Sequence, residues 1–434
     1  MRRTALENGL VLSMDDQIGT LDRGTVVIAG DRIEAVGGEP DVAGADVVDA
    51  SGCIVMPGLI DGHRHMFSAL LRGCAADASY EQYFQDVVMT YGAAYAPSDT
   101  GAAVALGASE ALDSGITTIH AWEHNLHTPD HADAAIEALI RSGLRGRFSY
   151  GPPNEPSVVD RSDVERQLAG RFGRELDGLH STSDGRLHLG LATRGFEFHD
   201  RDLWTGEFAF AREHGLPVTA HMSQAGMVAD CAAQGALGPD LLVIHARRTT
   251  PEERKALADT GTPVCIASPA IARAGLGRSP VRDLADAGIR LCLSVDSIAG
   301  CDSSDMFAVM RIAVLIERVH HEDVLAYTPE QALRHATIDA ANALGLGAVT
   351  GSLTPGKRAD VIMVRADALN MAPLNVPASQ LVLAGQPRNV DTVIVDGEVR
   401  KRDGVLVGVD VARQVEDATA AVRGIAARIG RPVV

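Results

Sequence analysis

The sequence predicts an α/β protein in which a (β/α)8, or TIM, barrel is combined with a small composite β-sandwich built from both chain ends. Three observations support this fold class. Short apolar segments alternate with Ala- and Leu-rich helical stretches in the middle of the chain, the two ends carry similar hairpin patterns, and ligand-type residues follow several apolar segments. We expect the barrel to occupy residues 58–355, and residues 1–57 and 356–434 to form the sandwich and a C-terminal helix.

The middle of the chain contains eight candidate barrel strands, because eight short apolar runs are separated by segments long enough to return the chain to the same edge. These runs are residues 59–61, 115–120, 146–150, 187–192, 217–221, 241–245, 264–267 and 290–295. Helical stretches between several of them are expected at 98–113, 131–142, 203–214 and 251–260.

The two chain ends each carry a hairpin pattern. Residues 25–29 and 32–36 flank the turn residues Gly30-Asp31, and residues 392–395 and 398–400 flank Asp396-Gly397. Together with an apolar run at 359–364, these segments predict a sandwich that the barrel interrupts. The recurrence of Ala, Val and Ile at helical spacing predicts a terminal helix over 411–429.

The composition of the chain disfavours several classes of function. The chain has 434 residues, 46% of them hydrophobic and 22% charged, and a net charge of −18, which argues against nucleic acid or an anionic membrane as the main partner. Its six cysteines are scattered without a CxxC pair, as in reduced compartments. No signal-peptide pattern or membrane-spanning apolar run is evident. We therefore expect a cytoplasmic protein that acts on a small molecule.

The run Pro57–His65, with sequence PGLIDGHRH, is the most informative motif. It fits a buried strand that enters a tight turn in which glycine is favoured. Side chains alternate between the faces of a strand, so His63 and His65 point the same way and Arg64 points away. Two imidazoles at one strand end can bind one metal ion.

Three further ligand-type residues end other candidate strands. His221 ends the fifth, His245 the sixth and Asp296 the eighth. Because the carboxyl ends of barrel strands meet at one rim, these residues are expected near His63 and His65. Histidines and a carboxylate form a mixed nitrogen and oxygen site suited to Zn²⁺ or Fe²⁺.

This set predicts hydrolytic chemistry. A metal ion at the rim would lower the pKa of bound water and give a hydroxide nucleophile. Asp296 can accept the proton of that water and bind the metal, and His245 can polarise the bond under attack or hold the developing oxyanion.

With these motifs the chain resembles the amidohydrolase superfamily, and most closely its cytosine deaminase, S-adenosylhomocysteine deaminase and triazine hydrolase branch. The resemblance implies one metal, most simply zinc, held by His63, His65, His221 and Asp296, with His245 as catalytic electrophile. The further segments that resemble the superfamily or this branch are residues 65–73, 305–311 and 351–360.

The fourth strand end bears on the number of metal ions. Binuclear enzymes of the family that this chain resembles place a carboxylated lysine, glutamate or cysteine there. The fourth candidate strand ends instead in residues 190–194, which contain no such ligand, and the chain's three lysines lie elsewhere. We therefore expect a mononuclear site. Arg194 is either a surface salt-bridge partner or a group that grips a substrate carboxylate or carbonyl.

Gln224 departs from the pattern of the deaminases that the chain resembles, which carry a proton-shuttling glutamate three residues after the fifth-strand histidine. A glutamine amide forms hydrogen bonds but carries no proton at ordinary pH. His124 and Glu123, after the second strand, are possible substitutes, or they are ordinary loop residues. Trp122 and Asn125 from the same segment are further candidates for substrate binding.

The sequence therefore supports a mononuclear hydrolase that cleaves a carbon–nitrogen bond, other than a peptide bond, in a small N-heterocycle. Because of Gln224, a ring-opening hydrolase of cyclic amides or a dehalogenating hydrolase with the same site is the alternative. A metal-free scaffold protein is a distant third hypothesis. A homo-oligomer is expected by resemblance, with Fe²⁺ as the second choice of metal.

Overall fold

The computed structural model describes residues 2–153, 158–176, 178–182, 184–193, 201–301 and 303–431. The chain forms two compact units. The first comprises Met1–Asp61, Ser109–Thr118 and Asp305–Val409, and the second comprises Gly62–Ala108, Ile119–Ser304 and Asp410–Val434. Among the described residues, no helix is both long and apolar enough to cross a membrane.

The first unit contains one continuous sheet built from both chain ends, as the sequence predicts. Its strand order is β20-β19-β18-β17-β5-β1-β2-β3, with β4 paired to β1. The antiparallel pair β5–β17 joins the N-terminal strands to the C-terminal ones. The strands are β1 (Arg3–Leu12), β2 (Thr20–Ala29), β3 (Arg32–Gly37), β4 (Asp46–Asp49), β5 (Cys53–Pro57), β17 (Val361–Arg365), β18 (Val390–Val395), β19 (Glu398–Arg402) and β20 (Val405–Leu406).

Apolar side chains from both ends share the core of this sheet. Leu6, Val26 and Val55 from the N-terminal strands are fully or almost fully buried with Val361 and Ile394 from the C-terminal ones. Burial of this apolar surface stabilises the composite arrangement. The helices of the unit are α11 (Met306–His321), α12 (Pro329–His335), α13 (Ile338–Ala343), α14 (Pro377–Ala384) and η5 (Pro387–Asn389).

The barrel strands form a second sheet, in the order β15-β14-β13-β12-β11-β8-β7-β6-β16. Strands β15 and β16 are consecutive parts of the eighth barrel strand: β15 pairs with β14, and β16 pairs with β6 and closes the barrel. The strands are β6 (Leu59–His65), β7 (Ile116–Glu123), β8 (Arg145–Tyr150), β11 (Leu187–Thr193), β12 (Val218–His221), β13 (Leu241–Ile244), β14 (Val264–Ile266), β15 (Leu291–Leu293) and β16 (Asp296–Ser297). The predicted fold class is confirmed.

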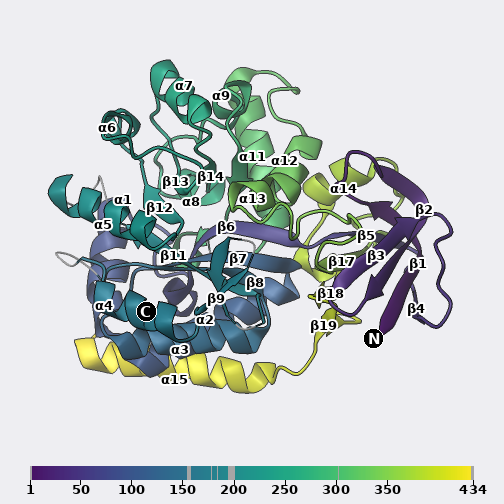
Figure 1. Ribbon diagram of the computed structural model, residues 1–434, viewed down its shortest axis with the longest axis horizontal. Helices are drawn as coiled ribbons and strands as arrows, with labels where there is room; N and C mark the ends of the chain where they lie inside the picture. Colours follow the sequence, from purple (N-terminus) through teal and green to yellow (C-terminus); the bar gives the residue numbers. More distant parts are fainter. Residues whose placement is uncertain are drawn as a thin grey trace. The chain divides into compact units, whose positions relative to one another are not determined.

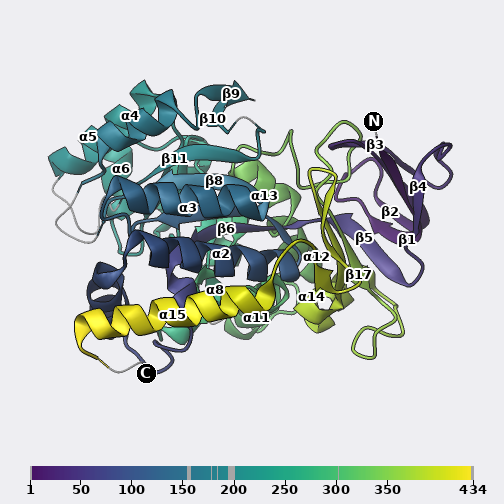
Figure 2. The ribbon, with the colours of Figure 1, turned by 90° about the horizontal axis from the view of Figure 1, so that it is seen from below.

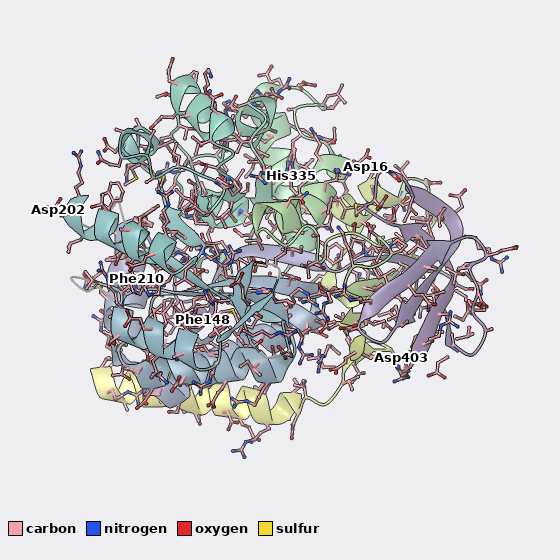
Figure 3. All side chains as sticks on the ribbon, viewed as in Figure 1. Asp16, Phe148, Asp202, Phe210, His335 and Asp403 are labelled. Carbon is pink, nitrogen blue, oxygen red and sulfur yellow. The ribbon has the colours of Figure 1, made fainter. Side chains whose placement is uncertain are left out.

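Helices surround these parallel strands (Figure 1). The wall between strands and helices is apolar: Phe148 on β8, for example, is fully buried (Figure 3). The helices are η1 (Met66–Leu71), α1 (Tyr80–Tyr83), η2 (Phe84–Tyr91), η3 (Gly92–Ala94), α2 (Pro97–Asp113), α3 (Pro129–Ser142), α4 (Arg161–Ala169), α5 (Arg201–Glu213), α6 (Met227–Ala233), α7 (Pro251–Asp259), α8 (Ser268–Arg273), α9 (Val281–Asp286) and α10 (Ile298–Cys301). A small hairpin, β9 (Arg174–Leu176) and β10 (Leu179–Ser181), adds to β11.

The terminal helix α15 (Val411–Ile429) belongs to the second unit, whereas the sequence analysis grouped it with the sandwich. Its apolar face, with Ala418, Ala421 and Ile425, packs against Phe67 of η1 and Ala103 of α2. Figure 2 shows this long yellow helix alongside α2. An amphipathic helix is placed by the apolar surface that covers its buried face, which sequence position does not reveal. The predicted domain boundaries themselves stay a prediction.

Two glycines of the PGLIDGHRH motif are required by close packing rather than by a turn. Neither Gly58 nor Gly62 has a positive φ, and β5 leads almost directly into β6. A Cβ atom on Gly58 would overlap the Thr117 side chain, and one on Gly62 would lie 2.6 Å from Sγ of Cys292. The expectation of a glycine turn was therefore wrong.

We expect Gly58→Ala to lower the free energy of unfolding by about 1–3 kcal/mol, because the added methyl group forces Thr117 to move within a packed sheet. Gly37→Ala is the matched control, since no atom lies within 4 Å of its added Cβ. Urea unfolding curves measure the difference. Equal midpoints for the two variants would contradict this account.

A largely buried histidine makes the stability of the first unit depend on pH. His335 of α12 lies 2.7 Å from the Tyr327 hydroxyl, and burial lowers its pKa from 6.5 to about 4 (Figure 3). The unfolded chain binds a proton near pH 6.5, whereas the folded chain keeps the imidazole neutral to about pH 4. Folding stability is therefore lost as pH falls through this interval.

We expect His335→Gln to remove this pH-dependent part of the unfolding free energy, which amounts to about 3 kcal/mol between pH 7 and pH 4. The measurement is the difference between wild-type and variant unfolding free energies at each pH. His320→Gln, at an exposed position of α11, is the control. A constant difference between wild type and H335Q across this range would contradict the prediction.

Candidate active site

The five residues expected at the barrel rim lie together in the second unit. His63 and His65 end β6, His221 ends β12, His245 follows β13 and Asp296 begins β16. The parallel register pairs Asp296 with Arg64, the residue between the two β6 histidines. Paired residues of neighbouring strands ordinarily share a face, but Asp296 has a left-handed backbone, and its carboxylate lies beside the two imidazoles. Arg64 points away from them and donates to the Ser304 hydroxyl.

The spacing of the ligand atoms fits a single small cation. Nε2 of His63 lies 3.2 Å from Nε2 of His65, and each lies 3.4 Å from Oδ1 of Asp296. Ligands about 2.0–2.1 Å from a tetrahedral zinc ion lie about 3.3–3.4 Å from one another. His221 completes the group, since one ring nitrogen of each of the three histidines lies within 4.8 Å of the others. The side chains thus match the donor set that zinc prefers.

Burial keeps the imidazoles in the form that binds metals. It lowers the pKa of His65 to about 3 and that of His245 to about 4, and it lowers the pKa of His221 well below 6.5. Burial by itself raises the pKa of Asp296, but the hydrogen bond from His63 and the neighbouring imidazoles bring it well below 3.8. At neutral pH the site therefore presents the neutral imidazoles of His65, His221 and His245 and an ionised carboxylate.

Two of these residues have a left-handed backbone conformation that L-residues rarely adopt. The φ angle is 75° at His245, 45° at the following Ala246 and 70° at Asp296. Such conformations cost about 1–3 kcal/mol each and are frequent at functional sites. They turn the chain at the ends of two barrel strands, and Nε2 of His245 then lies 3.7 Å from Oδ2 of Asp296.

The end of β7 and the segment after it supply side chains around the histidines. Nδ1 of His124 lies 3.1 Å from Nδ1 of His65, and the Trp122 ring packs at 4.7 Å from the His221 ring. Both Trp122 and His124 line the cavity described below. Asn125 is fully buried, its Oδ1 lies 3.1 Å from Nε2 of His127, and it is not part of the cavity lining. Its expected contact with substrate thus has no support in the geometry.

A cavity of about 170 Å³ opens beside the histidine cluster within the second unit. Gln224 lines it together with His65, His221, His245 and Asp296. Glu123, the other substitute for a proton shuttle, is fully buried outside this lining, and burial raises its pKa to about 8. Arg194 lies outside the described residues.

Sequence reasoning missed two arginines of the cavity wall, Arg247 and Arg273. A signal was present for the first, which stands two residues after His245.

The fourth barrel strand ends with Thr193, whose hydroxyl donates to the carboxylate of Glu207. The described part of this strand end therefore offers no bridging ligand for a second metal ion.

Comparison with protein-family models matches residues 54–400 to the amidohydrolase family. A 5-methylthioadenosine/S-adenosylhomocysteine deaminase of Halobacterium salinarum is 30% identical over 428 residues, which cover 95% of this chain and 96% of that protein. A 5′-deoxyadenosine deaminase of Methanothermobacter thermautotrophicus is 28% identical over 404 residues, covering 89% of this chain and 91% of that protein. The resemblance stated from the motifs is thereby confirmed.

Solved structures share the fold over almost the whole chain. An adenosine deaminase from Xanthomonas campestris with bound zinc has a TM-score of 0.85 at 23% identity, covering 98% of both chains. An atrazine chlorohydrolase from Arthrobacter aurescens complexed with zinc has a TM-score of 0.86 at 22% identity, covering 96% of this chain and 99% of that one. At this level of identity the similarity establishes the fold.

We expect His63→Ala to lower zinc affinity by at least about 100-fold, because it removes a ligand atom at the centre of the cluster. His124→Ala is expected to cost about 10- to 100-fold, the usual effect of removing a partner that orients a ligand. Competition with a chelator, with metal content by mass spectrometry, measures both. Wild-type zinc affinity in H63A would show that the cluster is not the metal site.

Proposed function

This chain belongs to the amidohydrolase family, and we propose that it is a mononuclear, metal-dependent aminohydrolase of a small N-heterocycle. The observation that carries the proposal is the 3.2–3.4 Å spacing among His63, His65 and Asp296, which suits one tetrahedral cation. The family membership and the deaminase relatives support hydrolysis of carbon–nitrogen bonds other than peptide bonds.

In this proposal His63, His65, His221 and Asp296 hold a divalent cation, with zinc as first choice and Fe²⁺ as second. Held by these residues, such a cation would lower the pKa of water towards neutrality and would so supply the nucleophile. The described end of the fourth strand, β11, carries no lysine, glutamate or cysteine that could bridge two ions, which supports one cation rather than two.

Two side chains are assigned to the chemical step. Asp296 is ionised and faces both His63 and His245, so it can accept the proton of the attacking water. His245 lines the cavity with a ring held beside Asp296, which suits it to polarise the ring carbon–nitrogen bond or to hold the negative charge that develops on the attacked group.

In this proposal the heterocycle binds against the cavity walls. Trp122 and His124 line the cavity beside the metal-binding histidines and offer ring faces to a planar substrate. Deaminases of 5-methylthioadenosine, S-adenosylhomocysteine and 5′-deoxyadenosine are among the relatives, so adenosine derivatives are the first substrate class to test. Arg194 is kept as a proposed substrate contact on the sequence alone.

Gln224 favours a second candidate function. Its amide lines the cavity but cannot shuttle a proton to a ring nitrogen. Ring opening of a cyclic amide, or displacement of halide, needs less protonation of the ring and so depends less on such a shuttle. The same metal cluster would serve either reaction.

We also propose that the protein is cytoplasmic and homo-oligomeric, without nucleic-acid or membrane partners. The six free cysteines support a cytoplasmic location. The net charge of −18 disfavours binding to polyanions such as nucleic acid. Exposed apolar side chains on and after α11 supply a candidate contact surface between copies, namely Leu315, Val319, Val324 and Leu325.

The direct test of function is a substrate panel of adenosine derivatives, other purines, pyrimidines, pterins and triazines, incubated with zinc-loaded protein. Release of ammonia supports the aminohydrolase. A mass gain of one water without ammonia supports ring opening, and release of halide supports the dehalogenating reaction. Absence of all three products across the panel, with zinc bound, would count against the proposal.

We expect Gln224→Glu to raise kcat for deamination by at least about tenfold, because a carboxylic acid at the cavity wall restores a proton shuttle. Gln234→Glu, at an exposed position after α6, is the matched control with the same chemical change. Steady-state kinetics with the best substrate of the panel measures both. Loss of deamination in Q224E, with ring-opening or dehalogenating activity retained by wild type, would favour the second candidate function.

A further inference from the structure

The metal-binding strand β6 is contacted by a buried histidine that does not belong to the cluster. Nδ1 of His120, on β7, lies 2.9 Å from the carbonyl oxygen of Gly62, and Nε2 lies 2.8 Å from Oγ of Ser149, on β8. Strands β8, β7 and β6 are neighbours in the barrel sheet. The two contacts therefore form one chain of hydrogen bonds across three strands, and this chain ends on the residue directly before His63.

The direction of both hydrogen bonds follows from the partners. A backbone carbonyl can only accept, so Nδ1 of His120 carries the proton that it shares with Gly62. Burial, together with the nearby charge of Arg147, holds the pKa of His120 well below 6.5, so the ring has a single N–H group at neutral pH. Nε2 is therefore an acceptor, and the Ser149 hydroxyl donates to it. His120 and Ser149 are both fully buried, so this arrangement is shielded from water.

Gly62 depends on such a contact because it has no side chain to anchor the strand. A Cβ atom on Gly62 would lie 2.6 Å from Sγ of Cys292 and 3.0 Å from Sγ of Cys265, so the packing requires glycine here. Glycine has the most freely rotating backbone of all residues. The hydrogen bond from His120 to the Gly62 carbonyl restricts that freedom at the point where the metal-binding part of β6 begins.

The position of the peptide between Gly62 and His63 bears directly on the cluster. Nε2 of His63 lies 3.2 Å from Nε2 of His65 and 3.4 Å from Oδ1 of Asp296, the spacing that suits one tetrahedral cation. Metal sites tolerate deviations of only about 0.2 Å in the distances to their ligands. A backbone shift of that size at Gly62 would carry the His63 imidazole with it, so a group that fixes this peptide also fixes the geometry of the cluster.

From this arrangement we propose that His120 is a positioning residue for the metal site: it fixes the Gly62 carbonyl, and with it His63, in the place that one divalent cation requires, while Ser149 holds the His120 ring. The inference rests on the proposed function. It adds to the site a residue that is neither one of the proposed ligands nor part of the cavity lining.

The competing explanation is structural: His120 would merely fill the barrel interior and stabilise the fold. His131 of α3 is the matched control, because it is a buried histidine with the same two kinds of partner. Nδ1 of His131 lies 2.8 Å from Oγ1 of Thr128, and Nε2 lies 3.1 Å from the carbonyl oxygen of Tyr95. Neither partner belongs to β6. A structural role predicts the same effect on metal binding at both histidines, whereas a positioning role separates them.

The experiment compares His120→Leu, His120→Asn, His120→Gln, Ser149→Ala and His131→Leu with the wild type, all as full-length protein. Asn places an amide N–H close to the position of Nδ1, whereas Gln places it closer to that of Nε2. The measurements are the zinc dissociation constant by competition with a chelator, the visible absorption spectrum of the Co²⁺-loaded protein, and urea unfolding of the metal-free protein. KM and kcat are measured at saturating zinc with the best substrate of the panel.

We expect H120L to weaken zinc binding by about tenfold or more, the usual effect of removing a group that orients a ligand, and S149A to cause a smaller loss. The Co²⁺ bands of H120L should shift, because they report coordination geometry. H120N should bind zinc within about threefold of wild type and restore the spectrum, whereas H120Q should resemble H120L.

The other readouts separate positioning from stability. H131L should lower the urea midpoint and leave zinc binding and the Co²⁺ spectrum as in wild type. At saturating zinc, H120L should lower kcat and leave KM within about twofold, because His120 does not line the cavity.

Three outcomes would overturn the inference: wild-type zinc affinity and Co²⁺ spectrum in H120L, equal zinc affinities in H120N and H120Q, or a loss of zinc affinity in H131L as large as that in H120L. If H120L does not fold, the comparison of H120N with H120Q, together with S149A, decides the question. Weaker zinc binding in H120L, in a protein that hydrolyses nothing in the panel, would sustain the positioning role and count against the hydrolase. Hydrolysis by the wild type, with unchanged zinc affinity in H120L, would do the reverse, and a wild type that takes up neither ion would overturn both.

Discussion

The site depends on the closure of the barrel between β16 and β6. This two-residue pairing sets Asp296 opposite Arg64 and Ser297 opposite His65. Regular alternation would point Asp296 the same way as its strand partner Arg64, away from the imidazoles. The left-handed backbone at Asp296 departs from that alternation, and Oδ1 of Asp296 lies 3.4 Å from both β6 imidazoles. The same pairing completes the barrel, so fold and site depend on one another.

The charge of Asp296 at this closure bears on the function of the site. A buried carboxylate is costly unless positive or hydrogen-bonding groups compensate it. Around Asp296 the neighbouring groups are imidazoles, which hold the pKa of its carboxyl well below 3.8, while burial keeps the rings of His65 and His245 neutral at pH 7. A divalent cation among them would balance the charge of the ionised carboxylate. The cluster is therefore better suited to binding a cation than to stabilising the barrel.

The proposed catalytic centre and the cavity wall around it differ in origin. The centre is built from strand ends, whose positions the barrel fixes. The wall is built from connections: Tyr83 and Phe84 after β6, Gln224 after β12, Arg247 after β13 and Arg273 at the end of α8. Connections vary without disturbing the barrel, so one family can retain its chemistry and change its substrates.

The sequence by itself determined the barrel, the composite sheet and the histidine and aspartate set, because each has a local signature: apolar runs of strand length, turn dipeptides, and ligand residues directly after strands. The alternation of a strand was enough to place His63 and His65 on one face. Tertiary structure alone decided the rest. It placed α15 on the barrel unit, required Gly58 and Gly62 for close packing, left Asn125 outside the cavity and brought Arg247 and Arg273 to one wall. These outcomes depend on contacts between segments far apart in the chain, and no local pattern encodes which distant surface a side chain will meet.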